Sequence, residues 1–429
     1  MTRSTHAADM SLVAPRPGDE RWMARAIELA RRGEGRTRPN PPVGAVLVRN
    51  VRCIAEGWHR RAGGPHAEEI ALRRAGAAAR GATLYVTLEP CCTHGRRPPC
   101  TDAILAAGVA RVVVAVRDPN PRHRGRGLRR LAAAGVEVVA GVGKAEAAAL
   151  IEPFACWIRR GRPFVTLKLA ATLDGRIADA AGASRWITGA AARREVQRLR
   201  RRADAVMVGR GTAAHDDPSL RPRPEGGRRP WRIVVASGGD VPLSARMLND
   251  EAVARTMIAV SDRCSAERES VLRNKGAEVL RLPEADEGGV DLAALLEALG
   301  RRDLLHVICE GGGALAASLF RAGLVDAVEY FLAPRLLGAT ARPAVGGGWS
   351  LTAMPELTWV DIRRLGRDAW LRLRPLRRRA QVRRSGRASE PRNSPVGNAR
   401  FSNTGVERAR KNGTEPVGKN PTGARRTAR

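Results

Sequence analysis

Short apolar runs alternate with amphipathic stretches along most of this 429-residue chain, and this alternation limits its fold more than any other feature. In the first part, the runs with the length and composition of buried strands are Val43–Val48, Thr83–Leu88, Arg111–Val116 and Val136–Gly141. The segment "RWMARAIELARR" has helical apolar spacing, and Asp19 stands before it as a candidate N-cap. Strands that alternate with helices predict an α/β layer fold.

The same alternation starts again after "RRGRP" (residues 159–163). It runs through "FVTLKLAATLDGRIA", a long basic helix at 190–202, "WRIVVAS", "LLHVICEGGGALAASLF" and late strands near 358–374. Because 429 residues exceed one ordinary hydrophobic core, two domains with extensions are expected. We predict an N-terminal extension at 1–18, a first domain at 19–160, a second at 161–375 and a basic disordered tail at 376–429.

The formal charge of +32 would suit a nucleic-acid-binding protein, but its distribution does not favour that function. From Arg377 onward the chain has 15 basic residues against 3 acidic ones, with few bulky apolar residues and no period. Only five of the 75 basic residues are lysines, which indicates a general bias toward arginine. We therefore expect a small-molecule substrate and no specific nucleic-acid partner.

The cysteines and the apolar segments of the sequence indicate in which cellular compartment the protein is expected. Seven cysteines, an odd number, and a metal-site pattern favour a reducing environment. No stretch approaches the roughly 18 apolar residues of a membrane helix, and residues 1–18 lack the apolar core of a secretory signal. The prediction is a cytoplasmic enzyme without a membrane partner. Its oligomeric state stays open, and a homo-oligomer is compatible with the sequence.

The segments "PHAEE" and "TLEPCCTHGRRPPC" carry the residues best suited to catalysis. His66, Cys91 and Cys100 would give Zn²⁺ one imidazole and two thiolates, and three protein ligands leave a fourth position open for water. Glu68 is then the expected proton shuttle. Because residues i and i+2 do not share a helix face, we place His66 and Glu68 in a first turn after Pro65. Cys100 likewise should open a helix behind two prolines.

Other interpretations of these residues remain open. A lone histidine or cysteine is more often packing than ligand, and Cys53, Cys156, Cys264 and Cys309 look like small core residues. The pattern H-x-E with P-C-x-x-C marks zinc nucleobase deaminases. Here the second cysteine comes nine positions after the first, which disfavours a tRNA or nucleoside deaminase. A nucleic-acid-binding protein with a structural zinc would need a fourth ligand, for which Cys92 or His94 could serve.

With these motifs the chain resembles the bifunctional deaminase/reductase family of riboflavin biosynthesis, whose members carry "PHAE", "EPC" and a "GRTPPC"-like end. The second half resembles the family's reductase half in "LKLAATLDG", "SRWITG", "VGRGTAAHDDPSL" and "HVICEGGGALAASL". The resemblance spans about 19–374. It implies an N-terminal cytidine-deaminase-like zinc domain followed by a dihydrofolate-reductase-like domain that uses NADPH. It also places the zinc ligand directly after Pro90, which selects Cys91 over Cys92.

The resemblance also implies binding residues. Those for NADPH are Ala170, Trp186, Thr212, Asp216, Ser237, Gly312, Gly313, Ala314, Leu315, Ala316, Ala317 and Ser318. Those for substrate are Asn40, His59, Lys168, Ser184, Arg200, Leu220, Arg223 and Glu310. Three of these residues also have simpler interpretations. Asn40 could be a turn residue, His59 a surface residue, and Asp216 part of a turn before Pro218. The chain departs from the family at three positions. Ala170 stands where relatives often have glycine, Pro42 where some have Asn, and Thr93 where many have His.

The implied reaction has two steps. Zinc-dependent hydrolytic deamination of 2,5-diamino-6-ribosylamino-4(3H)-pyrimidinone 5′-phosphate comes first, with Glu68 moving the proton. NADPH-dependent reduction of the ribosyl group to a ribityl chain follows. Arginines suit this substrate because their planar fork binds phosphate through two hydrogen bonds.

Overall fold

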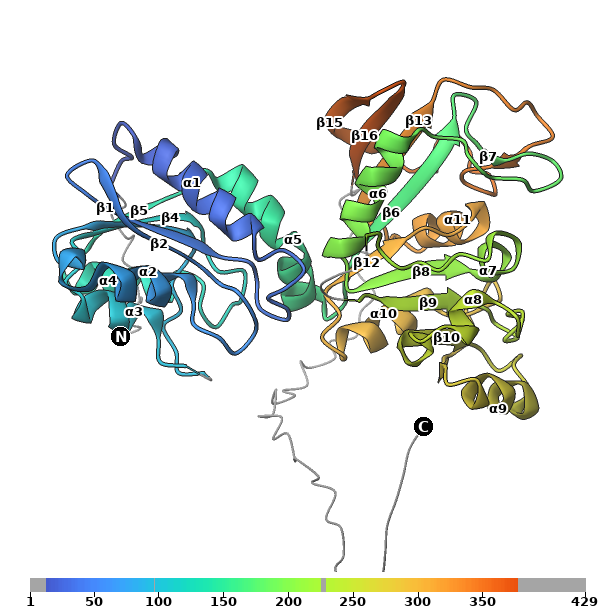
Figure 1. Ribbon diagram of the computed structural model, residues 1–429, viewed down its shortest axis with the longest axis horizontal. Coiled ribbons are helices and arrows are strands. Elements are labelled where there is room, and N and C mark those ends of the chain that lie inside the picture. The colour runs from blue at the N-terminus through green and yellow to red at the C-terminus, as the bar shows by residue number, and fades with distance from the viewer. Residues whose placement is uncertain (1–12, 96, 225–228, 377–429) are drawn as a thin grey trace, which may run out of the picture. The chain divides into compact units, whose positions relative to one another are not determined.

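The computed structural model describes residues 13–95, 97–224 and 229–376, which form two α/β halves in succession (Figure 1). The predicted α/β class is confirmed. Two predictions concern residues that lie mostly outside the described ranges. These are the N-terminal extension at 1–18, without a secretory signal, and the disordered tail at 376–429.

The first sheet has five strands in the order β2-β1-β3-β4-β5. They are β1 (Gly44–Arg49), β2 (Arg52–Trp58), β3 (Thr83–Leu88), β4 (Arg111–Val116) and β5 (Glu137–Ala140). β1 runs antiparallel to both β2 and β3, whereas β3, β4 and β5 are parallel. The apolar runs predicted four of these strands. β2 was not predicted, because this edge strand carries polar residues among its apolar ones.

Helices cover both faces of the first sheet, with α1 and α5 on one side and α2, α3 and α4 on the other (Figure 1). Their bounds are α1 (Asp19–Arg31), α2 (Ala67–Ala75), α3 (Cys100–Ala106), α4 (Arg126–Ala133) and α5 (Lys144–Arg160), with a 3-10 turn at η1 (Gly76–Ala79). Alternate residues of β1 separate the two cores. Ala45 and Leu47 pack with α2 and α4, whereas Val46 and Val48 pack with α1. Both faces of the sheet are therefore buried.

Two glycines bring helices α1 and α2 close to the sheet. A Cβ on Gly44 would lie 2.0 Å from the carbonyl oxygen of Ala26 in α1. A Cβ on Gly57 would lie 2.2 Å from that of Ala67, the first residue of α2. Only glycine allows backbones to approach this closely. Gly57 thereby fixes the start of α2, where His66 and Glu68 lie.

The second sheet has nine strands in the order β11-β10-β9-β8-β12-β6-β13-β16-β15. β16 runs antiparallel to both of its neighbours, β13 and β15, and the other neighbouring pairs are parallel. The strands are β6 (Phe164–Thr172), β8 (Ala205–Gly209), β9 (Trp231–Val235), β10 (Thr256–Val260), β11 (Glu278–Arg281), β12 (His306–Cys309), β13 (Ala327–Ala333), β15 (Leu357–Leu365) and β16 (Asp368–Pro375). Separately, β7 (Arg176–Ala178) pairs with β14 (Arg342–Pro343). Since the strands β12, β8, β9 and β10 are parallel, their carboxyl ends share one edge.

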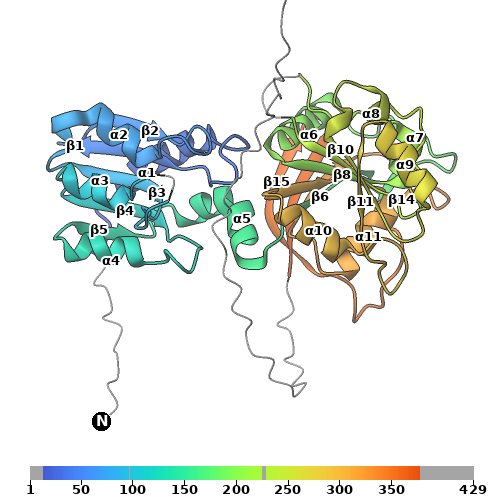
Figure 2. The same cartoon turned by 90° about the horizontal axis from the view of Figure 1, so that it is seen from below.

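Figure 2 shows α10 and α11 on one side of this second sheet and α6, α8 and α9 on the other. The helices are α6 (Ala190–Arg202), α7 (Arg210–Asp216), α8 (Arg246–Asn249), α9 (Ala266–Asn274), α10 (Leu292–Gly300) and α11 (Gly313–Arg321), with a 3-10 turn at η2 (Val253–Arg255). The predicted basic helix at 190–202 matches α6. Alternation again separates the cores, because Met207 packs with α10 and α11 while Val206 and Val208 pack with α8 and α9.

Two predictions about single residues were wrong. Asp19 does not cap α1: Gly18 occupies that position, and the Asp19 carboxylate is buried, where it accepts hydrogen bonds from Tyr85 and Arg111 at 2.7–2.8 Å. An ion pair with a buried arginine outweighs capping here. Cys53 is exposed rather than a core residue, since it lies on edge strand β2. The other three cysteines assigned to the core are buried, as predicted.

In the part of the chain that the structure describes, none of the helices combines the length and apolar character that crossing a membrane requires.

Candidate active sites

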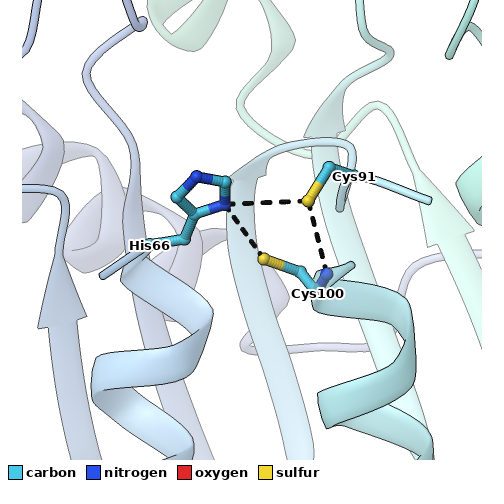
Figure 3. A group of neighbouring side chains, drawn as sticks. All are labelled: His66, Cys91 and Cys100. Atoms are coloured by element: carbon cyan, nitrogen blue, oxygen red, sulfur yellow. Dashed lines mark hydrogen bonds between the residues drawn. The ribbon is translucent and has the colours of Figure 1, made fainter. Parts of the chain in front are cut away.

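Three side chains from separate loops and helices meet at one edge of the first sheet (Figure 3). His66 is the N-cap of α2, Cys91 follows β3, and Cys100 opens α3. The predictions that Glu68 lies in a first helical turn and that Cys100 opens a helix are confirmed, whereas His66, predicted inside that first turn, is the residue before it. The backbone N–H of Cys100 also points at Cys91 Sγ, 3.3 Å away, so that a helix start favours a thiolate at Cys91.

The three donor atoms fit a zinc ion. His66 Nδ1 lies 3.1 Å from Cys100 Sγ and 3.7 Å from Cys91 Sγ, and all three atoms lie within 4.8 Å of one another. Zinc bonds of about 2.0–2.3 Å place neighbouring tetrahedral donors roughly 3.6 Å apart. Among the described residues, neither Cys92 nor His94 joins this group. Three ligands leave one coordination position open, as a catalytic site requires.

Glu68 lies beside this cluster in the first turn of α2 and is 4% exposed. Burial raises the pKa of its carboxyl group, against the opposing charge of His66. A carboxyl group with a raised pKa beside an open metal site can both take up and return a proton.

Half-buried Asn40 and buried His59 form a hydrogen-bonded pair next to the cluster. His59 Nδ1 lies 2.9 Å from the Pro65 carbonyl oxygen, which can only accept, so this nitrogen carries the proton. Burial lowers the pKa of His59, which keeps the ring neutral and leaves Nε2 an acceptor. Asn40 Nδ2 donates to it at 3.1 Å. The rings of His59 and His66 pack edge to face, with their centroids 5.4 Å apart. His59 therefore contacts one of the three residues of the metal cluster.

A cavity of about 750 Å³ in the second half collects most of the predicted substrate residues. It is lined by Lys168, Ala170, Ser184, Trp186, Arg200, Thr212, Asp216, Leu220, Arg223, Glu310 and Gly312, among others. Arg200 donates two hydrogen bonds, of 2.6 and 2.9 Å, to the Glu310 carboxylate. Lys168 Nζ lies 3.8 Å from the same carboxylate. Two cations of the cavity lining, Arg200 and Lys168, thus lie beside the buried Glu310 carboxylate.

The charged groups in this cavity shift one another's pKa values. Burial lowers the pKa of Lys168, which Glu310 partly offsets. Burial alone would raise the pKa of Glu310, but the charges of Arg200 and Lys168 lower it below its usual value. Asp216 is not a free turn residue, because it ends α7 and accepts a 2.6 Å hydrogen bond from the Ser184 hydroxyl group. These groups are positioned for a polar, phosphorylated ligand.

A second cavity of about 1140 Å³ adjoins the first and shares Ser184, Thr212, Asp216 and Gly312 with it. Of the predicted cofactor residues it adds Ser237, Gly313, Ala314, Leu315 and Ser318. Ala316 and Ala317 line neither cavity, because they lie on the buried face of α11. The glycine-rich start of α11 lies where the cavities join, and a helix N-terminus there favours a phosphate.

Comparisons with known proteins match both halves. Residues 17–116 match a family model described as the cytidine and deoxycytidylate deaminase zinc-binding region, and residues 163–371 match the RibD C-terminal domain. The riboflavin biosynthesis protein RibD of Escherichia coli (strain K12) is 43% identical over 370 residues, which cover 83% of this chain and 99% of that protein. The chain belongs to the RibD family.

Solved structures of RibD-family proteins agree with this assignment. RibD of Acinetobacter baumannii (form 1) matches with a TM-score of 0.75 and 38% identity, over 84% of this chain and 99% of that one. A diaminohydroxyphosphoribosylaminopyrimidine deaminase/5-amino-6-(5-phosphoribosylamino)uracil reductase from Thermotoga maritima matches with a TM-score of 0.71 and 36% identity, over 83% and 99%. The predicted family, fold and two cofactors are confirmed: this RibD-family chain is a bifunctional deaminase and reductase of riboflavin biosynthesis, with zinc in its first half and NADPH as the reductant.

The sequence did not reveal the role of Glu89, which lies two residues before Cys91 and holds the loop after β4 next to the zinc site. Its buried carboxylate accepts backbone hydrogen bonds from Asp118, Gly125 and Gly127 at 2.9–3.1 Å. It thereby ties the loop after β4 to the segment that carries Cys91. An acidic residue directly after an apolar strand and before Pro90 was the available signal.

A second contact that the sequence did not reveal lies between Arg97 and Glu69. Arg97 donates two hydrogen bonds, of 2.8 and 2.5 Å, to the Glu69 carboxylate on α2. The segment between the two cysteine ligands is thereby fastened to the helix that carries Glu68.

Proposed function

We propose that the first half deaminates 2,5-diamino-6-ribosylamino-4(3H)-pyrimidinone 5′-phosphate by hydrolysis. The observation that carries this proposal is the cluster of His66, Cys91 and Cys100 with Glu68 buried beside it. When bound, zinc supplies a Lewis acid that makes water acidic enough to react near neutral pH.

The residues of this half divide the remaining work. Glu68 takes one proton from the attacking water and delivers it to the departing amino group, so that the ring carbon exchanges its C–N bond for a C–O bond and ammonia leaves. Because Asn40 gives one N–H to His59, its amide oxygen and second N–H stay available for the polar edge of the pyrimidine. Asn40 and His59 thereby orient the ring toward Glu68.

For the second half we propose reduction of the ribosyl group of the deaminated product. NADPH, when bound, supplies a hydride, which C1 of the ribosyl group accepts while the ring oxygen takes a proton and the ring opens. Lys168 Nζ, whose pKa burial lowers, holds a proton in the same cavity and is our candidate donor. Arg200 and Arg223 line the cavity as binding groups for the phosphate.

We further propose the boundaries 19–160 and 161–375 for the two catalytic domains. Because a zinc site with two thiolates needs reduced cysteines, we place the enzyme in a reducing compartment such as the cytoplasm. A homo-oligomer remains compatible with these proposals.

The test is to incubate purified full-length protein with the diaminopyrimidine substrate, with and without NADPH, while following ammonia and NADPH absorbance. We expect ammonia release in both mixtures and NADPH oxidation only after ammonia has begun to appear. NADPH oxidation without ammonia release would contradict the proposed order of steps.

A further inference from the structure

A loop at 217–224, directly after α7, borders the first cavity of the reductase half and lies outside the helices and strands that the structure describes. The predicted substrate residues Leu220 and Arg223 lie on this loop and line the cavity. Three of its eight residues are prolines, which lack the backbone N–H that a helix or strand would use. Contacts from outside the loop must therefore hold Arg223 at the cavity.

Two residues of the loop have a strained backbone. Asp217 has a φ of 39° and Leu220 a φ of 54°, both in the left-handed region, which a bulky residue such as leucine rarely adopts. Such a conformation persists only where the surroundings hold it. Arg246 holds the Asp217 carboxylate through its backbone N–H and Nε at 2.8 and 2.9 Å, and the Leu220 side chain is buried in the core. Both contacts act on the start of the loop, so its end needs a further anchor.

Helix α6 holds the backbone at the end of the loop. Gln197 Oε1 accepts a hydrogen bond of 2.7 Å from Arg223 N, and Arg201 donates to the Arg223 carbonyl oxygen at 3.1 Å. Arg200, which also pairs with Glu310, donates to the Arg221 carbonyl oxygen at 3.3 Å. These three residues of α6 stand at i, i+3 and i+4, so they share one face of the helix.

The side chain of Arg221 ties the loop to the second sheet. It is 13% exposed, and its Nη1 lies 2.5 Å from a Glu251 carboxylate oxygen and 4.0 Å from one of Asp250. Asp250 is itself fixed, because it accepts hydrogen bonds of 2.6 and 2.8 Å from Arg232. Arg232 lies on β9 and is 1% exposed. Through this chain of charges the loop is fastened to a buried strand.

Arg221 acts on the cavity from outside it. Of the described residues that line the first cavity, none is Arg221, Asp250 or Glu251, although both Leu220 and Arg223 are among them. An effect of Arg221 on the reductase would therefore pass through the position of the loop and not through contact with a ligand.

We propose that Arg221 is a positioning residue of the reductase, which holds the loop so that Arg223 meets the 5′-phosphate of the substrate. The inference rests on the proposed function, which places this phosphate at Arg200 and Arg223. A planar guanidinium binds a phosphate through two hydrogen bonds only when both groups are correctly oriented. Without the tether to Asp250 and Glu251, Arg223 would lose this orientation and substrate binding would weaken.

The test compares the deaminated substrate with its dephosphorylated nucleoside form, by following NADPH oxidation in the full-length protein. The wild type should prefer the phosphorylated form in kcat/KM. Arg221→Gln should raise KM for the phosphorylated form about tenfold, the scale of one lost charge-assisted contact, with little change in kcat. It should leave kcat/KM for the nucleoside form and KM for NADPH unchanged. Arg221→Lys, which keeps the charge, should restore part of the preference.

Two further variants complete the test. Glu251→Gln removes one partner of Arg221 and leaves the Arg232–Asp250 pair intact, so it should cause the same kind of loss to a smaller extent and tests the tether even if Arg221→Gln does not fold. Arg302→Gln is the matched control, because Arg302 also pairs with a glutamate, Glu278, but lies away from the first cavity. It should behave like the wild type with both forms of the substrate.

The outcomes separate this inference from the proposed function. If the wild type shows no preference for the phosphorylated form, the placement of the phosphate at Arg200 and Arg223 fails. If the wild type shows the preference and Arg221→Gln and Glu251→Gln keep all of it, the inference is wrong while the proposed function stands. An equal loss on both forms of the substrate would also overturn the inference, because it would show a general structural role.

Discussion

Asn40 donates an amide N–H to Nε2 of His59 across 3.1 Å, and the Pro65 carbonyl oxygen fixes which ring nitrogen of His59 accepts. The direction of the Asn40 amide therefore depends on His59, and so do the donor and acceptor that we propose it offers to the pyrimidine.

Asn40 and His59 should behave as one unit in deamination. Asn40→Ala and His59→Ala should each lower kcat/KM for ammonia release about 10- to 100-fold, the cost of leaving a buried polar partner unsatisfied. The double variant should lose little more than either single one, because the second change removes an interaction already broken. Steady-state ammonia assays on the three variants measure this. Fully additive losses would show that the two residues act independently.

Removing the proton shuttle and removing a ligand should have different signatures. Glu68→Gln should keep one zinc per chain and lose about 100- to 10,000-fold in kcat for ammonia release, the usual contribution of a general acid–base group. Cys91→Ser should lose both zinc and deamination. Zinc analysis beside the ammonia assay distinguishes them. Full activity in Glu68→Gln would remove Glu68 from the mechanism.

The two activities should be separable at Gly312. This glycine caps α11 at the junction of the two cavities, and a Cβ there would lie 3.5 Å from Thr212 Oγ1. Gly312→Val fills space that the cofactor needs, so KM for NADPH should rise about tenfold or more, a loss of roughly 1.4 kcal/mol. Ammonia release should stay at the wild-type rate. A parallel loss of both activities would contradict separate sites.

Stability of the first half should depend on pH through Asp19. Although burial opposes it, hydrogen bonds from Arg111, the Arg16 backbone and Tyr85 lower the pKa of Asp19 to about 2. A lowered folded-state pKa gives stability that is present above the unfolded value, near 4, and is lost as the pH falls toward 2. Asp19→Asn should therefore cost about 2 kcal/mol at pH 7.

Denaturant unfolding of both proteins at pH 7 and near pH 2.5 tests this, with zinc added in excess at pH 7. The difference between wild type and Asp19→Asn should shrink at the lower pH. A gap that is constant with pH would mean that packing, rather than the charge of Asp19, sets the cost.

The sequence predicted those parts of the molecule that depend on local pattern. Runs such as Thr83–Leu88 and Arg111–Val116 are buried on both faces, so composition alone marks them as strands, and the structure has β3 and β4 at these bounds. Prolines before Cys100 gave the start of α3 correctly. The residue types in the two motifs indicated a metal site, the family resemblance selected Cys91 over Cys92, and the structure brings His66, Cys91 and Cys100 together.

What the sequence could not show depends on contacts between distant residues. Asp19 has the composition of a cap, but Arg111, 92 residues away, makes it half of a buried ion pair. Glu89 supports the zinc loop only because the chain from Asp118 to Gly127 folds back onto it.

The most direct test of the account is X-ray absorption at the zinc edge of the active, full-length protein. We predict one zinc per chain bound by one nitrogen and two sulfur atoms of the protein, with a fourth, light-atom position filled by solvent. A sphere of four protein ligands, or full ammonia release from metal-free protein, would contradict the account.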